Sequence, residues 1–353
     1  MAEQKKITMQ DVARNAGVSK STVSLVLNNH PRISEATKAR VQKICRKLNY
    51  SPNVFAKTLA CSSGTQSESR FLGTIGLLTS QEFDQRKKLV PKSAMWDRQI
   101  TEACQKAGYK LDSFIIGPSR KEQQAVNRIL QARGIQGLLV YGSNEPIHEW
   151  DIEWKKFASI AYSSSLYEHF IHNVMSTSYQ DVYEATVRLM NRGYQRPGYF
   201  QSGPRLDQWN VGFNSAFQGE PGKKVPIPCL SIPDFFKNRQ NEDRLLKWIS
   251  KYQPDVILAN LGDHLLQVLE REGIRVPEDI GFLCLDVWEP RLHLSGLRQL
   301  RQTAFQVAVD LLHSMLMRNE FGPPEQPICI QVPSLWNEGK TLRSPEASSA
   351  HRQ

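Results

Sequence analysis

Residues 7–28 read Ile7-Thr-Met-Gln-Asp-Val-Ala-Arg-Asn-Ala-Gly-Val-Ser-Lys-Ser-Thr-Val-Ser-Leu-Val-Leu-Asn28. The first half of this stretch predicts a short helix that Thr8 caps at its N-terminus, where the negative charge of Asp11 is favourable. Gly17 permits the sharp turn that ends the helix, because glycine adopts left-handed backbone conformations without a steric penalty. The apolar residues that recur at helical spacing in this helix are Met9, Val12, Ala13 and Ala16.

Two further helices are predicted after this turn. Ser19 can cap a helix from Lys20 to about Asn28, and Ser34 can cap a third helix. The second helix has an apolar face of Val23, Val26 and Leu27, and the third has one of Val41, Ile44, Cys45 and Leu48. Short helices joined by a turn with glycine form the helix-turn-helix pattern, which other small helical bundles share. The sequence therefore predicts an all-α domain over residues 1–50.

The net charge is concentrated in the same part of the chain. The 353 residues carry a formal net charge of +10, with 45 Lys+Arg against 35 Asp+Glu. Residues 1–60 hold eleven of the basic side chains and three of the acidic ones, so they carry +8 of that charge. A basic module beside a nearly neutral body favours a polyanion, most simply nucleic acid, as partner. A solvated basic surface is the alternative.

Composition and motifs exclude several other classes. No apolar run approaches the roughly 20 residues that span a bilayer, and the N-terminus lacks the apolar core of a secretory signal. The six cysteines form no Cys-x-x-Cys pair, which argues against a zinc site and favours a reducing cytoplasm. His169 and His172 lie three residues apart without a carboxylate motif, so we expect a loop or surface pair. No hydrolase, P-loop or zinc-protease motif is present, so we expect no catalytic residue, metal or cofactor.

Three stretches of the N-terminal module resemble the DNA-binding head of the LacI/GalR family of bacterial transcription regulators. They are residues 7–28, Ile33-Ser-Glu-Ala-Thr-Lys-Ala-Arg-Val41 and Leu48-Asn-Tyr-Ser-Pro-Asn-Val-Phe-Ala-Lys-Thr-Leu59. The resemblance implies that the second helix lies in the major groove, with Lys20, Ser21 and Leu25 at base-reading positions. Some members have arginine at the last of these positions, where leucine offers only apolar contact. The positions that match DNA-backbone contacts are Thr8, Ser19, Thr22, Ser24, Asn28, Ser34 and Thr37.

The segment after the head resembles the hinge helix of the family. Residues 52–60 give about two turns of helix, which is too short to be stable alone in water. The resemblance implies that the segment folds when two copies meet on DNA, where Leu59 is wedged into a minor-groove step and kinks the duplex. The residues that match neighbouring minor-groove contacts are Asn53, Ala56 and Lys57. Residues 51–70 are therefore expected to be the hinge helix and a Ser-rich linker.

From residue 71 onward, short apolar runs alternate with amphipathic stretches. This alternation predicts parallel sheets covered by helices, and about 270 residues are too many for one such sheet, so we expect an α/β body of two lobes. The candidate strands are residues 72–79, 110–116, 137–141, 157–161, 173–177, 198–201, 255–259 and 281–285. The candidate helices are residues 94–106, 121–133, 180–192, 243–252, 263–272 and 305–318.

The body also resembles the same family, whose body is similar to a periplasmic sugar-binding protein. The stretches that carry this resemblance are residues 193–200, 258–260, 273–281, 284–286 and 297–305. It implies an effector-binding and dimerisation domain over residues 71–341, in which the chain crosses between the lobes three times. The lobes are expected over roughly residues 71–172 plus 301–328, and 173–300 plus 329–341. We expect residues 342–353 to be a disordered tail.

A ligand in such a body lies between the lobes, at the carboxyl ends of the strands. Asp286 matches the family's cleft aspartate, an acceptor for ligand hydroxyls, and Gln302 matches a residue at the lobe junction. Sugar-responsive members usually have two arginines where this chain has Asp207 and Trp209. The residues that we expect to bind an effector are Trp209, Asn260, Asp263, Asp286, Trp288 and Gln302, with Phe235 or Phe236 as a further apolar platform.

The sequence as a whole predicts a sequence-specific, DNA-binding transcriptional regulator, taken as a repressor, that works as a cytoplasmic homodimer and joins the nucleoid when bound to DNA. Its partners are a pseudo-palindromic double-stranded operator, with half-sites one helical turn apart, and a small molecule such as a sugar. Two alternatives stay open. One is a body whose cleft binds nothing, which Trp209 and Leu261 support as departures from the family. The other is a sugar-binding or sugar-processing protein with an incidental basic head.

Overall fold

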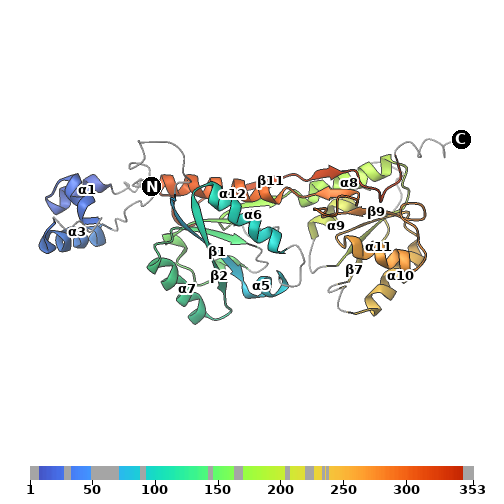
Figure 1. Cartoon of the computed structure of the whole chain (residues 1–353), viewed down its shortest axis with the longest axis horizontal. Helices are drawn as coiled ribbons and strands as arrows, with labels where there is room; N and C mark the ends of the chain where they lie inside the picture. Colours follow the sequence, from blue (N-terminus) through green and yellow to red (C-terminus); the bar gives the residue numbers. More distant parts are fainter. Residues whose placement is uncertain are drawn as a thin grey trace.

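The computed structural model describes residues 8–27, 33–48, 71–87, 93–141, 146–162, 170–202, 207–218, 226–232, 235 and 238–344. Within these ranges, three helices form an N-terminal head, and two six-stranded sheets form the two lobes of a body (Figure 1). The long helix α12 Arg301–Arg318 lies along the first lobe and begins next to the second. The helical head and the two-lobed α/β body expected from the sequence are therefore confirmed.

The head is formed by α1 Met9–Ala16, α2 Lys20–Leu27 and α3 Glu35–Lys47. Thr8 and Asp11 cap α1 reciprocally: Thr8 Oγ1 accepts from the Asp11 N–H at 3.3 Å, and Asp11 Oδ2 accepts from the Thr8 N–H at 2.9 Å. Gly17, with φ of 62°, donates its N–H to carbonyls of α1 and ends that helix as expected. The core that the helices share consists of Val12, Ala13, Ala16, Val23, Val26, Val41 and Cys45. The side chain of Leu27 lies outside the described part of the head.

The first lobe is built on a parallel sheet. Its strands are β1 Gly73–Ser80, β2 Tyr109–Ile116, β3 Gly137–Tyr141, β4 Ala158–Tyr162, β5 His172–Ser176 and β11 Cys329–Val332, in the order β11-β5-β4-β3-β1-β2. Helix α6 Ser93–Lys106 and helix α12 pack on one face, and α7 Arg120–Ala132 packs on the other. The short helices of this lobe are α5 Gln81–Lys87, η1 Ile147–Glu149 and η2 Trp154–Lys156.

The second lobe has the same architecture. Its strands are β6 Pro197–Gln201, β7 Leu230–Ser231, β8 Val256–Ala259, β9 Gly281–Cys284, β10 Gly296–Arg298 and β12 Leu335–Asn337, in the order β12-β10-β9-β8-β6-β7. All pairs are parallel except β10 with β12. Helices α8 Ser178–Asn191 and α9 Asp207–Ser215 pack on one face of the sheet, and α10 Gln240–Tyr252 and α11 Asp263–Arg271 pack on the other.

The chain crosses between the lobes three times: after β5, after β10 and after β11. The boundaries expected at residues 172 and 328 are too early by about five residues. Strand β11 pairs with β5, and β5 also pairs with β4, so both strands extend the sheet of the first lobe. The first crossing therefore lies at Thr177, and the third lies between β11 and β12.

The ordered body extends beyond its expected end at residue 341. Leu342 is only 6% exposed and packs in the core of the second lobe, and the Arg343 N–H donates to Tyr194 Oη at 2.9 Å. The prediction of a disordered tail is therefore wrong for residues 342–344, because the apolar side chain of Leu342 packs in the core of the second lobe. Residues 345–353 lie outside the described part of the chain.

Replacing Gly17 with alanine tests the turn that orients α2. A Cβ atom at this position would have no atom within 4 Å, so the cost arises from the left-handed backbone alone. We expect Gly17→Ala to destabilise the head by about 1–2 kcal/mol, measured as faster hydrogen exchange of head amides in the full chain. Gly134→Ala is the matched control, because Gly134 has φ of 66° and equal open space in the first lobe. Unchanged head exchange in Gly17→Ala would contradict this role.

Candidate functional site

Helix α2 presents the residues that are expected to read DNA. Lys20 and Ser21 are exposed at its N-terminal end, and Leu25, one turn further on, is half-buried. The N-terminal end of a recognition helix is the part that meets base edges in the major groove. There Lys20 can donate to O6 or N7 of guanine, Ser21 can donate or accept, and Leu25 makes apolar contact only. The geometry fits base reading, and the three roles stay predictions.

Several hydroxyls that match DNA-backbone contacts also cap helices. Ser19 Oγ accepts from the Thr22 N–H at 3.0 Å, and Ser34 Oγ accepts from the Thr37 N–H at 3.3 Å. Both expected caps are therefore confirmed. Ser19 and Ser34 are exposed, so each can face a phosphate while it caps.

The basic face of the head lies mainly on α3, where Arg40, Lys43 and Lys47 are exposed and Lys38 is half-buried. Exposed cations on one helix suit phosphate contacts, which release counterions. The expected DNA contacts at Asn28, Asn53, Ala56, Lys57 and Leu59 lie outside the described residues, so those roles stay predictions.

In the second lobe, the expected effector residues Asn260 and Asp286 follow neighbouring strands. Asn260 comes directly after β8, and Asp286 comes two residues after the end of β9. Ser202 follows β6, on the other side of β8, and its Oγ donates to Asn260 Oδ1 at 2.9 Å. Because these strands are parallel, the three side chains lie at the same carboxyl edge of the sheet, where α/β folds bind ligands.

Asp286 is occupied by an ion pair with Arg301, the first residue of α12. Arg301 Nη1 donates to Asp286 Oδ1 at 2.8 Å, and Arg301 Nη2 donates to Asp286 Oδ2 at 3.2 Å. The two side chains are 14% and 10% exposed. The Arg301 guanidinium also lies over the ring of Trp96 on α6, 5.2 Å from its centroid. This ion pair joins the second sheet to the helix layer of the first lobe.

A cavity of about 470 Å³ adjoins this ion pair, and we call it the junction cavity. Helix α6, the β9–β10 loop and the start of α12 form its walls. Two expected effector residues, Trp288 and Gln302, line it, and Gln302 Nε2 lies 3.5 Å from Glu102 Oε2. Trp288 Nε1 is buried without a hydrogen-bond acceptor among the described residues.

Asp263 faces the β9–β10 loop. Its carboxylate pairs with Arg291 Nε at 2.7 Å and with His293 Nε2 at 2.8 Å. The Arg291 guanidinium also stacks on Trp288, 5.4 Å from the ring centroid. Asp263 therefore holds the loop that carries Trp288, and its expected contact with a ligand stays a prediction.

The remaining aromatic candidates lie in the core. Trp209 on α9 is 8% exposed and packs with Tyr199 and Phe213 in one core cluster. Phe235 is 1% exposed in the other core cluster of the second lobe, and Phe236 lies outside the described residues. Trp209 and Phe235 thus fill the interior, and neither presents an open face.

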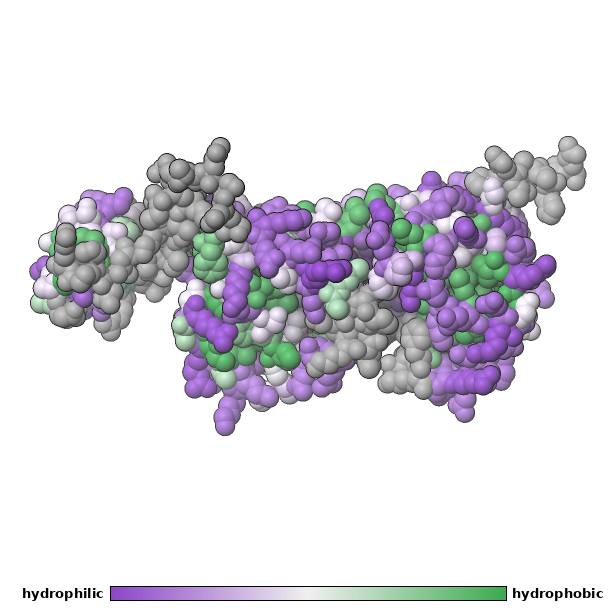
Figure 2. Space-filling view, viewed as in Figure 1, coloured by the Kyte–Doolittle hydropathy of each residue, from purple (hydrophilic) through white to green (hydrophobic). Residues whose placement is uncertain are grey.

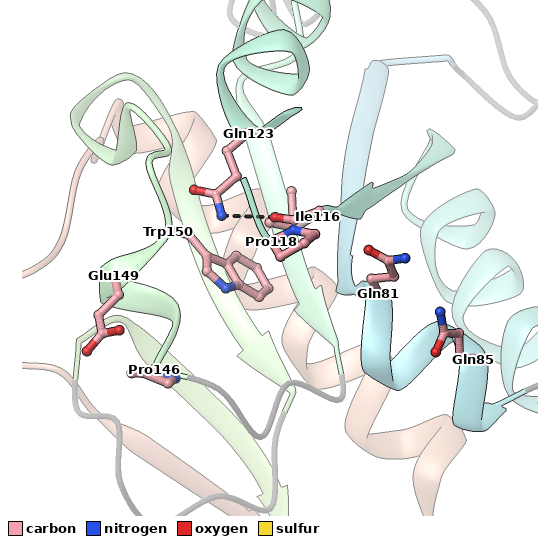
Figure 3. A pocket seen from close by; sticks show the side chains of 9 residues that line it. Gln81, Gln85, Ile116, Pro118, Gln123, Pro146, Glu149 and Trp150 are labelled. Atoms are coloured by element: carbon pink, nitrogen blue, oxygen red, sulfur yellow. Dashed lines mark hydrogen bonds between the residues drawn. The ribbon is translucent and has the colours of Figure 1, made fainter. Parts of the chain in front are cut away.

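A second cavity, of about 580 Å³, lies at the carboxyl ends of β1 and β2, and we call it the first-lobe cavity (Figure 3). Gln81 and Gln85 on α5 line one side of it, and Glu149 and Trp150 line the other. Gln123 Nε2 donates to the Gly117 carbonyl at 3.0 Å and fixes the cavity wall. Sequence reasoning missed these residues, although Gln81 comes two residues after the strand expected over residues 72–79 and directly after β1.

The crossings themselves are tied by Asp181 on α8, which is 8% exposed. Its carboxylate accepts from Thr177 Oγ1 at 2.6 Å and from Ser334 Oγ at 2.6 Å. Thr177 lies in the first crossing and Ser334 in the third, so one buried carboxylate joins two of the three connections.

Among the described residues, no group of three His, Cys, Asp or Glu side chains is placed to hold a metal ion. His172 Nδ1 accepts from the Ile328 N–H at 3.1 Å, and burial lowers the pKa of this imidazole. Within the described ranges, no helix is long and apolar enough to cross a bilayer.

Comparison with protein families gives two matches. Residues 8–53 match the model of bacterial regulatory proteins of the lacI family, and residues 186–337 match a periplasmic binding protein-like domain. The transcriptional repressor PurR of Aliivibrio salmonicida is 33% identical over 320 residues, which cover 86% of this chain and 91% of the relative. The regulator MalR of Streptococcus pneumoniae serotype 4 is 29% identical over 204 residues, or 57% of this chain and 58% of the relative.

Solved structures share the fold at low identity. A lac repressor dimer bound to operator and the anti-inducer ONPF has a TM-score of 0.60 at 19% identity and covers 96% of this chain and 100% of its own. A complex of the regulator CelR with cellobiose has a TM-score of 0.59 at 19% identity, with coverage of 95% and 100%. These likenesses extend over the head and both lobes.

Substitutions at two nearby serines, Ser19 and Ser21, distinguish helix capping from base reading. We expect Ser19→Ala to lower the stability of the head by about 1 kcal/mol, because Thr22 loses the acceptor for its N–H. The exposed Ser21 is the matched control, and Ser21→Ala should change the preferred DNA sequence with little effect on stability. Hydrogen exchange of the head and binding to a set of operator variants measure the two effects. Equal loss of stability in both variants would contradict the assignment.

Proposed function

Because the chain belongs to the lacI family of bacterial regulatory proteins, we propose that it is a repressor that binds a pseudo-palindromic operator as a homodimer. A small molecule that binds the body lowers or raises its affinity for this operator. The observation that carries the proposal is the capped helix α2, which exposes Lys20 and Ser21 beside the basic face of α3. Its site of action is the chromosome, in the cytoplasm.

The effector side of the proposal rests on the two lobes, the junction cavity and the first-lobe cavity. Their volumes, about 470 and 580 Å³, fall within the range of small-molecule sites. A ligand that prefers one arrangement of the lobes shifts the population of that arrangement and, through the linker, the spacing of two heads on DNA. We propose that Asn260, Trp288 and Gln302 contact the effector directly, and that Asp286 takes part through its ion pair with Arg301.

A second copy of the chain binds the second half-site of the operator. The lac repressor to which the fold is similar was solved as a dimer on its operator. In this chain β2 is an edge strand, and Ile115 in it is 49% exposed. Apolar side chains gather over β1 and β2 on a surface that is otherwise largely hydrophilic (Figure 2). An edge strand has unpaired backbone N–H and C=O groups, which the same strand of a symmetric partner can cover.

Selection of bound sequences from a random DNA pool tests the proposed operator. We expect a dyad-symmetric motif with half-sites one helical turn apart. Lys20→Ala should relax the selected base at one position of each half-site, at a cost of about 1–3 kcal/mol in discrimination. Arg40→Ala is the matched control: it should weaken binding to all sequences alike and reduce the salt dependence. A motif without dyad symmetry, or an unchanged motif in Lys20→Ala, would contradict the proposal.

A further inference from the structure

We propose that the junction cavity recognises a hydroxylated organic anion, one that carries a carboxylate or phosphate group, and that Arg301 is the residue that binds its charge. This inference rests on the proposed role of the body as an effector sensor, and it names the chemical class of the effector.

The first step is that Arg301 already binds Asp286 in the way that it would bind an anionic ligand. Its Nη1 and Nη2 donate to the two carboxylate oxygens at 2.8 and 3.2 Å, and the pair is largely buried. Each carboxylate oxygen has a second lone pair, so a ligand hydroxyl can still donate to Asp286 while the ion pair stays intact. The guanidinium fork, in contrast, is shaped to hold a carboxylate or a phosphate.

An anion can compete with Asp286 for Arg301. Its carboxylate or phosphate oxygens fit the planar fork of the Arg301 guanidinium as well as an aspartate does. The stacking of Arg301 on Trp96, on the first-lobe side, holds the guanidinium in place during such an exchange. Asp286 lies on the second lobe, so the displaced carboxylate can turn toward solvent as the lobes separate.

The rest of the junction cavity fits such a ligand. Three arginines (Arg98, Arg298 and Arg301) line it against two glutamates, Glu102 and Glu289. Glu102 lies 4.0 Å from Arg98, and Asp286 pairs with Arg301, so Arg298 and Glu289 are the lining charges without an ion pair among the described residues. The N-terminal end of α12 also opens here without a side-chain cap, and the helix dipole favours negative charge at that end.

Two unpaired polar atoms point to hydroxyls or further oxygens on the same ligand. Within the described structure, Trp288 Nε1 and Gln99 Oε1 are both buried and lack a hydrogen-bond partner, and both residues line the cavity. The indole N–H is a donor for a ligand oxygen, and the amide oxygen is an acceptor for a ligand hydroxyl. A buried polar atom without a partner is costly, so a ligand that satisfies both gains affinity.

The same exchange explains how the ligand acts on the lobes. Arg301 starts the helix that packs on the first sheet, and Asp286 follows a strand of the second sheet. An anion on Arg301 therefore removes an ion pair that joins the lobes, and it favours the arrangement in which they are apart.

Calorimetry on the full chain tests the proposal with matched pairs of compounds at constant ionic strength: ribose with ribose 5-phosphate, glucose with glucuronate, and inorganic phosphate alone. We expect at least one anion to bind at least about tenfold more tightly than its neutral counterpart. Asp286→Asn should bind that anion about tenfold more tightly than wild type, because no carboxylate competes for Arg301. Arg301→Gln should lose the preference.

Arg318→Gln is the matched control, since Arg318 lies at the other end of α12 and pairs with Glu320 at the surface. It should keep the wild-type preference. Equal affinity for the members of every pair, a preference that survives in Arg301→Gln, or no anion binding in both wild type and Asp286→Asn would overturn the inference. A neutral sugar that binds and changes operator affinity would overturn it while leaving the effector-sensor proposal intact.

Discussion

Two lobes joined by three chain segments can move only about those segments, and this constraint organises the rest of the body. The first and third crossings lie side by side, because the buried carboxylate of Asp181 accepts hydrogen bonds from a residue of each. Rigid sheets on either side then turn a small change at the junction into a displacement of whole lobes. The ion pair of Asp286 with Arg301 lies next to these crossings, which is why one pair of side chains can bias the arrangement of both lobes.

The head obeys a different constraint, since about 50 residues bury only a small core. Its three helices share one apolar cluster, and each begins at a hydroxyl that satisfies a free backbone N–H. Ser19 and Ser34 serve stability first, and their exposed positions then let them face a DNA phosphate. We therefore expect a change at either serine to affect both the stability of the head and its binding to DNA.

Much of the architecture was predictable from local patterns. The strand expected over residues 137–141 has the same bounds in the structure, because Gly-Leu-Leu-Val-Tyr is a continuous apolar run that both faces of a parallel sheet bury. The caps at Thr8, Ser19 and Ser34 follow from residue type alone. The strands that were missed, β7, β10, β11 and β12, have two to four residues each and owe their existence to a neighbouring strand rather than to their own sequence.

The site was less predictable, because its geometry depends on residues that the fold brings together. Asp286 was identified as a cleft residue, but nothing local indicates that Arg301, 15 residues further on and in the other lobe's helix layer, neutralises it. Asp263 likewise meets Arg291 and His293 only because the β9–β10 loop folds back over α11. Trp209 was expected to be an apolar platform for a ligand, but its side chain packs in the core of the second lobe.

The coupling between the lobe junction and the head is tested most directly by operator affinity without any ligand. Fluorescence anisotropy with the selected operator would compare wild type with Asp286→Asn, which lacks the charge that joins the lobes. If the junction controls the head, the dissociation constant changes by at least about fivefold, the lower end of typical allosteric couplings. Equal affinities for wild type and Asp286→Asn would contradict the coupling and leave a head that binds DNA independently of its body.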